Sequence, residues 1–190
     1  MDHTLTVAAV QFEHRDGDKP HNLERIEALA RQAVAQGAEL VAFHECSIPG
    51  YTFLQHLDRE AMLALAEPVP DGPSLRRLDA LAGQLGVVLM VGLIERDAND
   101  RLYNAYVALD GSGQARLHHR KLHVFINPHL TPGDHYTVGE IRGTRVGVLI
   151  CYDNNLPENV RITSLLGAEL IVMPHVTGAT PVADGRTRPN

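Results

Sequence analysis

The stretch RVGVLICYDNNLPE, residues 145–158, combines an apolar run, a cysteine, turn-forming polar residues and a proline. Residues 146–150 have the composition of a buried strand, and Pro157 stands where a helix often begins. A strand that turns sharply into a helix places its last side chain at the rim of the sheet, near the unpaired N–H groups of that helix. We therefore expect Cys151 to ionise more easily than a free cysteine and to be nucleophilic.

The composition limits the classes of protein that this sequence can encode. The 190 residues are 44% hydrophobic, which suits one domain with a sizeable core. The net charge of −6 argues against nucleic acid or an anionic membrane as a partner. No apolar run approaches the roughly 18 residues of a membrane-spanning helix. We expect no signal peptide, and the two widely separated cysteines favour a reduced, cytoplasmic protein.

Apolar segments of strand and helix length alternate along the chain, as is typical of an α/β protein. The predicted buried strands are residues 5–12, 39–45, 87–94 and 169–174. The predicted helices are residues 20–36, 59–66, 74–85 (capped by Ser74) and 157–166. Antiparallel strands are predicted at residues 102–109, 114–123, 137–142 and 144–150. The segments QGAEL (36–40) and LGAEL (166–170) each join a helix to a strand, which suggests two similar αβ units.

Three polar residues lie at or near predicted strand ends: Glu45, Lys121 and Cys151. Ligands bind at strand ends in α/β sheets, so these side chains can converge there. A carboxylate can accept the thiol proton, a lysine can hold that carboxylate and an oxyanion, and the thiolate can attack an electrophilic carbon. Taken one at a time, a packing cysteine, a solvated glutamate and a surface lysine are the more common explanations.

Four stretches resemble, in chain order, the motifs of the nitrilase superfamily of carbon–nitrogen hydrolases. They are VAAVQF (7–12), FHECSIPGY (43–51), HRKLH (119–123) and CYDNNLPENVR (151–161). The resemblance implies an αββα sandwich of mixed sheets layered with helices. It assigns residues 1–178 to a carbon–nitrogen hydrolase domain that is truncated on its C-terminal side, followed by a disordered tail at residues 179–190.

The resemblance also implies a Glu–Lys–Cys triad that needs no cofactor. In that scheme Glu45 is the general base and Cys151 forms a thioester or thioimidate. Lys121 and the backbone N–H of Tyr152 stabilise the oxyanion. A second pair, Glu158 and Arg161, is expected to form an ion pair that positions the loop.

Five residues near the predicted site are candidates for substrate binding: Tyr51, His129, Tyr152, Asn154 and His175. His129 stands eight residues after Lys121, where the family often has a second glutamate, so it is expected to hydrogen-bond the substrate or Lys121. Tyr51 and Asn154 have structural alternatives, which are loop packing and a helix N-cap.

The eleven histidines raise the question of a metal site. On a straight strand His119 and His123 point the same way but lie about 13 Å apart, too far to share one ion. We therefore expect no metal.

Three functional hypotheses follow for the whole chain. The first is hydrolysis of a non-peptide C–N bond in a small amide or carbamoyl compound. The second is hydrolysis of a small nitrile by the same triad. The third is a catalytically silent family member that serves as a binding or assembly module. The resemblance also implies a homodimer or larger homo-oligomer, formed through the helix after Cys151.

Overall fold

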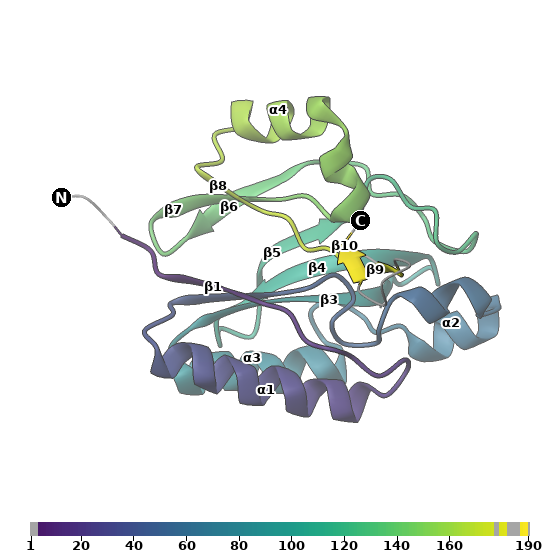
Figure 1. Cartoon of the computed structure of the whole chain (residues 1–190), viewed down its shortest axis with the longest axis horizontal. Helices are drawn as coiled ribbons and strands as arrows, with labels where there is room; N and C mark the ends of the chain where they lie inside the picture. Colours follow the sequence, from purple (N-terminus) through teal and green to yellow (C-terminus); the bar gives the residue numbers. More distant parts are fainter. Residues whose placement is uncertain (1–3, 177–178, 182–186, 190) are drawn as a thin grey trace.

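Two sheets lie face to face between two layers of helices in the computed structural model, which describes residues 4–176, 179–181 and 187–189 (Figure 1). The first sheet has the order β1-β2-β3-β4-β5, with bounds Val7–Val10, Leu40–Phe43, Val88–Arg96, Leu102–Leu109 and Ala115–Arg120. The second has the order β6-β7-β8, with bounds Thr137–Ile141, Thr144–Val148 and Leu170–Val172. Parallel and antiparallel pairs occur in both sheets. The predicted αββα sandwich is confirmed.

The helices cover the outer faces of the two sheets. Helices α1 (Lys19–Ala35) and α3 (Pro73–Leu85) lie on the five-stranded sheet, and α4 (Pro157–Leu165) lies on the three-stranded sheet (Figure 1). One apolar cluster fills the space under α1 and α3, and a second fills the space between the sheets. A third packs α2 (Arg59–Leu65) and η1 (Thr52–His56) against one end of the first sheet.

The helix boundaries follow local signals in the sequence. Asp18 caps α1 by accepting the His21 N–H at 3.1 Å. Gly86 ends α3 in the left-handed conformation, as predicted. The predicted Ser74 cap is wrong, because α3 begins one residue earlier, with Gly72 as its N-cap. The Ser74 hydroxyl instead donates to the buried Glu67 at 2.7 Å.

Strand β1 differs from its prediction as a strand buried on both faces. Its side chains alternate between exposed and half-buried, and Val7 is 41% exposed. Among the described residues β1 pairs only with β2, so it lies at the edge of the sheet. An apolar run alone does not distinguish an edge strand from a central one. Strands β3 and β4 are almost entirely buried.

The repeated Gly-Ala-Glu-Leu segments fold in the same way. Gly37 and Gly167 have φ of 91° and 94°, values that favour glycine, and each ends a helix. The next acidic residues, Glu39 and Glu169, each accept a backbone N–H from a neighbouring strand segment, at 3.0 and 2.9 Å. One unit leads into β2 of the first sheet and the other into β8 of the second. The prediction of two similar αβ units is confirmed.

The expected disordered tail, residues 179–190, lies in part outside the described residues. Its described parts, β9 (Ala179–Pro181) and β10 (Thr187–Pro189), pair with each other antiparallel. Within the described residues, no helix has both the length and the apolarity needed to cross a membrane.

Gly92, in the middle of β3, provides a first test of how this fold positions its loops. A Cβ at Gly92 would lie 2.3 Å from the backbone nitrogen of Cys46, so a side chain there has to displace the segment that follows β2. We expect Gly92→Ala to lower the free energy of unfolding by about 3 kcal/mol, at the upper end for overpacking.

Chemical denaturation measures this change. Gly113→Ala is the control, because its φ is 78° but no atom lies within 4 Å of the new Cβ. The control is expected to lose only about 1 kcal/mol, the cost of a left-handed backbone. Equal losses in the two variants would contradict the contact argument.

Candidate active site

A buried ion pair joins the ends of two strands of the first sheet. Glu45 lies two residues after β2, and Lys121 directly follows β5. Lys121 Nζ is 2.6 Å from Glu45 Oε1, and the two side chains are 1% and 0% exposed. Because charged side chains are seldom buried without a partner, each allows the other to lie in the interior. The structure thus brings together two of the three residues in the predicted triad.

Asn104, in the middle of β4, holds both members of this ion pair. Its side-chain Nδ2 donates to Glu45 Oε1 at 2.8 Å, and its backbone carbonyl accepts the backbone N–H of Lys121 at 2.8 Å. Asn104 is absent from the sequence-based candidates. The signal that points to it is an amide within an otherwise apolar strand, LYNAYVAL, because a buried amide needs polar partners.

The second carboxylate oxygen of Glu45 is free. Oε2 is buried, and no described residue gives it a hydrogen bond. An unpaired carboxylate oxygen in the interior is costly, so it marks a position where a proton donor can bind. A thiol or a water molecule is a suitable donor there.

Cys151 is held in an unusual backbone conformation at the start of η2 (Cys151–Asn155). Its φ is 49°, in the left-handed region, and its N–H donates to the Pro174 carbonyl at 2.9 Å. Non-glycine residues pay about 1–2 kcal/mol to adopt this conformation. Such strain is concentrated at functional sites, and the strained residue here carries a half-buried thiol.

The prediction that the Cys151 thiol ionises easily is wrong. Burial raises its pKa, the negative charge of Glu45 raises it further, and Lys121 only partly opposes these effects, so the pKa is about 11. Helix α4 begins at Pro157, as predicted, but its N-terminus lies six residues after Cys151, so its N–H groups do not offset these effects. The resting thiol is therefore neutral, so a nucleophilic role for Cys151 requires a base that removes its proton.

Aromatic side chains surround the ammonium group of Lys121. Its Nζ is 5.3 Å from the ring centre of Tyr51 and 5.2 Å from that of Phe125. The buried Tyr51 hydroxyl has no partner among the described residues, and burial, followed by the charges of Glu45 and Cys46, raises its pKa. The exposed ring of Tyr152 packs edge-on against Phe125 at 5.7 Å. Tyr51 thus lies beside the ion pair, and Tyr152 contacts Phe125, whose ring also lies next to Lys121.

Asn154 and His175 contact each other next to Cys151. Asn154 Nδ2 is 3.0 Å from His175 Nε2, and Asn154 Oδ1 is buried without a partner among the described residues. Asn154 does not cap α4, so the capping alternative is wrong. His175 lines a groove of about 330 Å³ between β1 and β8.

His129 and the Glu158–Arg161 pair lie away from this constellation. The His129 side chain is exposed, and its backbone N–H donates to Asn127 Oδ1 at 2.9 Å. No contact joins His129 to Lys121. Glu158 and Arg161 are both exposed and form no ion pair with each other, so that prediction is wrong.

His119 and His123 approach the same carboxylate, that of Asp153. Asp153 Oδ1 is 3.0 Å from His123 Nδ1, and Oδ2 is 3.8 Å from His119 Nε2. The predicted separation of the two histidines assumed a straight strand, whereas β5 ends at Arg120 and the chain turns. Among the described residues, no three histidine, cysteine or acidic side chains form a group that can hold a metal ion.

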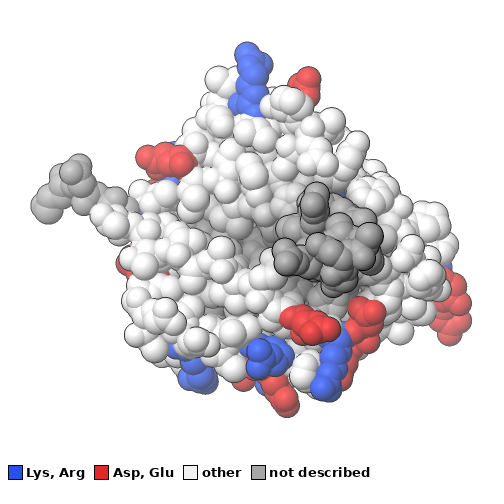
Figure 2. Space-filling model, viewed as in Figure 1, with Lys and Arg blue, Asp and Glu red and all other residues white. Residues whose placement is uncertain are grey.

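Charged side chains are mixed in sign on the face seen in Figure 2. Basic and acidic groups lie around the rim, and the middle of this face, apart from the part covered by undescribed residues, is uncharged. No extended basic patch is visible on this face.

Comparisons with known proteins place the chain in a family. Residues 6–187 match the model of the carbon–nitrogen hydrolase family. The chain is 35% identical to N-carbamoylputrescine amidase of Solanum lycopersicum, over 95% of this chain and 61% of that protein. It is 33% identical to a nitrilase of Pyrococcus abyssi, over 94% of this chain and 70% of that protein. It thus spans about three fifths of the length of the first curated relatives.

A solved structure shows the same architecture. Nit3 of Saccharomyces cerevisiae, a member of branch 10 of the nitrilase superfamily, superposes with a TM-score of 0.78 and 26% identity. The match covers 95% of this chain and 66% of Nit3. With the family match over residues 6–187, these likenesses show that the chain belongs to the carbon–nitrogen hydrolase family, within the nitrilase superfamily.

Proposed function

We propose that this protein hydrolyses a non-peptide C–N bond of a small amide or carbamoyl compound, with Cys151 as nucleophile. The observation that carries the proposal is the buried Glu45–Lys121 pair, which leaves Glu45 Oε2 unpartnered while the charges of both residues act on the Cys151 thiol. Such a site contains a base, a cation and a nucleophile in a water-poor environment.

The first half of the reaction forms a thioester. Glu45 Oε2 accepts the proton of the Cys151 thiol as Sγ attacks the carbonyl carbon. The oxyanion that develops is stabilised by Lys121 Nζ and by the Tyr152 N–H, which lies in the first turn of η2, where N–H groups have no partner within the turn. The tetrahedral intermediate collapses, and the leaving ammonia or amine takes the proton from Glu45.

The second half releases the acid. Glu45 removes a proton from water, and the oxygen of that water attacks the thioester carbon. The same oxyanion donors stabilise the second tetrahedral intermediate. Its collapse breaks the C–S bond, returns the proton to Sγ and leaves the carboxylic or carbamic acid product. No cofactor enters either half.

The amide and carbamoyl class is supported by the functions named for relatives. Besides the N-carbamoylputrescine amidase, they include a citrullinase and an omega-amidase at 28% and 32% identity. The aromatic residues Tyr51, Phe125 and Tyr152 next to Lys121 suit a small substrate with an apolar part. Since the nucleophile must be a reduced thiol, we propose a reducing compartment such as the cytoplasm.

Nitrile hydrolysis is the second candidate, because the Pyrococcus abyssi relative is named a nitrilase. The same thiol can add to a nitrile carbon to give a thioimidate. Ammonia release from a matched panel of amides and nitriles distinguishes the two candidates. Turnover of the nitriles alone would favour the second. No turnover of any compound would favour a silent binding or assembly module.

Replacement of the nucleophile gives the direct test of the mechanism. We expect Cys151→Ala to lower kcat by about 10³-fold or more, since it removes the covalent step. The control is Cys46→Ala, because Cys46 is fully buried and its Sγ faces Asn104 Oδ1 at 3.6 Å. That variant is expected to keep at least about a tenth of the wild-type rate. Equal rates in wild type and Cys151→Ala on every substrate would rule out the mechanism.

Glu45→Gln is expected to change turnover and thiol reactivity in opposite directions. The Glu45 charge raises the pKa of Cys151, so removing it lowers that pKa from about 11 and increases the thiolate fraction at pH 8. Alkylation by iodoacetamide should therefore become faster, by about tenfold for each unit of pKa. Turnover should fall by about 10²-fold or more, because the base is lost.

Glu67→Gln is the matched control for Glu45→Gln. Glu67 is also buried and also pairs with a lysine, Lys19, at 2.7 Å, but it lies between α2 and α3. Its replacement is expected to leave both the alkylation rate and turnover per folded molecule within about twofold of wild type. A parallel loss of both readouts in Glu45→Gln would contradict the assignment of Glu45 as base.

We also propose that copies of the chain associate through α4. Leu165 and Leu166, at the end of this helix, are 71% and 48% exposed, which is unusual for neighbouring leucines on a surface. Leu165→Glu should shift the mass measured by sedimentation toward the monomer. A monomeric wild type across a concentration series would contradict this association.

A further inference from the structure

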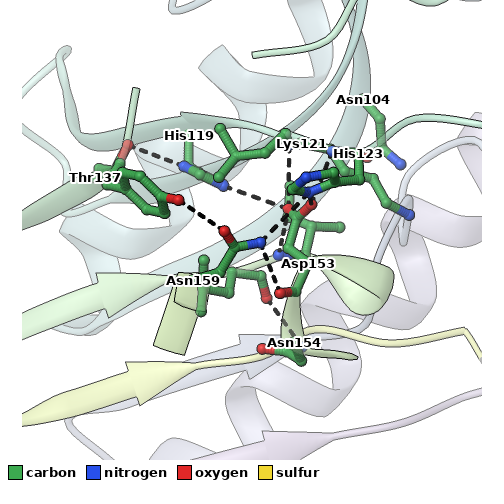
Figure 3. Close-up of polar contacts among 12 residues, drawn as sticks. Asn104, His119, Lys121, His123, Thr137, Asp153, Asn154 and Asn159 are labelled. Carbon is green, nitrogen blue, oxygen red and sulfur yellow. Dashed lines mark hydrogen bonds and ion pairs between the residues drawn. The ribbon is translucent and has the colours of Figure 1, made fainter. Parts of the chain in front are cut away.

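One carboxylate, that of Asp153, contacts both chain segments that carry Lys121 and Cys151 (Figure 3). Oδ1 accepts the backbone N–H of His123 at 2.9 Å, and His123 Nδ1 lies 3.0 Å away. Oδ2 accepts the N–H groups of Leu122 and Ile150, both at 3.2 Å. Leu122 directly follows Lys121, and Ile150 directly precedes Cys151. The carboxylate therefore connects the two segments within one residue of each functional side chain.

The donors around Asp153 require a charged carboxylate at this position. Asp153 is fully buried, and burial by itself raises a carboxyl pKa. The nearby His119 ring, together with hydrogen bonds from His123 and from two backbone N–H groups, outweighs that effect and holds the pKa of Asp153 below its ordinary value. A carboxylate has about four acceptor positions on two oxygens, and here both oxygens face donors. An amide in its place offers one oxygen and turns an NH₂ group toward donors.

The surrounding residues fix Asp153 itself. Asn159 of α4 donates to the Asp153 carbonyl at 2.9 Å, and the Tyr136 hydroxyl donates to Asn159 Oδ1 at 2.7 Å. On the other side, His119 Nδ1 is 3.0 Å from Thr137 Oγ1 of β6 (Figure 3). Asp153 is thus anchored to α4 through its backbone carbonyl, and the His119 ring beside its carboxylate is in turn held by β6.

We propose that Asp153 is a positioning residue that sets the distance between Lys121 Nζ and Cys151 Sγ. The inference rests on the proposed function, in which these two groups act on the same substrate carbonyl. A displacement of about 1 Å in such a site costs about 10²-fold in rate. Because Asp153 acts through the backbone and does not contact the substrate, its loss affects kcat more than KM.

The experiment compares Asp153→Asn with wild type in three readouts: kcat, KM and the rate of Cys151 alkylation by iodoacetamide between pH 7 and 10. We expect kcat to fall about 10²-fold with KM within about threefold. We expect alkylation at pH 8 to slow at least about fivefold, because Lys121, which stabilises the thiolate, is no longer held in place. Glu67→Gln is again the control, since it removes a buried carboxylate that accepts a backbone N–H elsewhere in the chain.

Two results would overturn the proposal. One is a folded Asp153→Asn protein with kcat and alkylation within twofold of wild type. The other is an equal loss of kcat in Glu67→Gln. If the wild type turns over no amide or nitrile, the proposed function fails, while the alkylation rates still test the positioning role.

Asp153→Glu keeps the proposal testable if Asp153→Asn does not fold. Glutamate retains the charge and both oxygens but moves them by one methylene. We expect kcat and the alkylation rate of Asp153→Glu to fall at least about threefold, but less than those of a folded Asp153→Asn protein. Wild-type values in Asp153→Glu would show that the spacing set by aspartate is unimportant and would overturn the proposal.

Discussion

The buried contact between Glu45 and Lys121 is the constraint on which the site depends. Two charges of opposite sign lie in the interior with a separation of 2.6 Å, and neither is stable there without the other. Replacing such a pair by apolar residues often costs a fold nothing, so its presence is better explained by chemistry than by stability. Two further residues accommodate the pair. Asn104 donates a hydrogen bond to Glu45, and Gly92 has no side chain, which lets the segment after β2 lie directly on β3.

Burial, and then the ion pair, explain why the Cys151 thiol is neutral at rest. A thiolate beside Glu45 alone would be repelled, and a thiolate beside Lys121 alone would be strongly stabilised. With both charges present and the thiol half-buried, the proton stays on sulfur. The strained backbone at Cys151, with φ of 49°, is a second feature of this position that is typical of functional sites.

Much of the fold could be predicted from local patterns. The Gly-Ala-Glu-Leu segments predicted two similar αβ units, since a glycine C-cap followed by an apolar run has one common outcome. The edge position of β1 could not be predicted, because composition does not reveal which strands are neighbours. For the site, Glu45, Lys121 and Cys151 could be found at strand ends. The thiol pKa and the role of Asn104 could not, because both depend on residues that approach from other elements.

The two sheets contribute different residues to the site. The unit ending in β2 delivers Glu45 to the rim of one sheet, and β7 delivers Cys151 to the rim of the facing sheet. Glu45 and Cys151 therefore come from different sheets, which are the sources of the base and the nucleophile in the proposed mechanism. Lys121, from β5, pairs with Glu45 in its own sheet, while the segment after it is held by Asp153 from the opposite layer. Groups from two sheets stay aligned only if the sheets are joined near those groups. The buried Asp153 carboxylate joins them there, because it accepts N–H groups from the segment after Lys121 and the segment before Cys151.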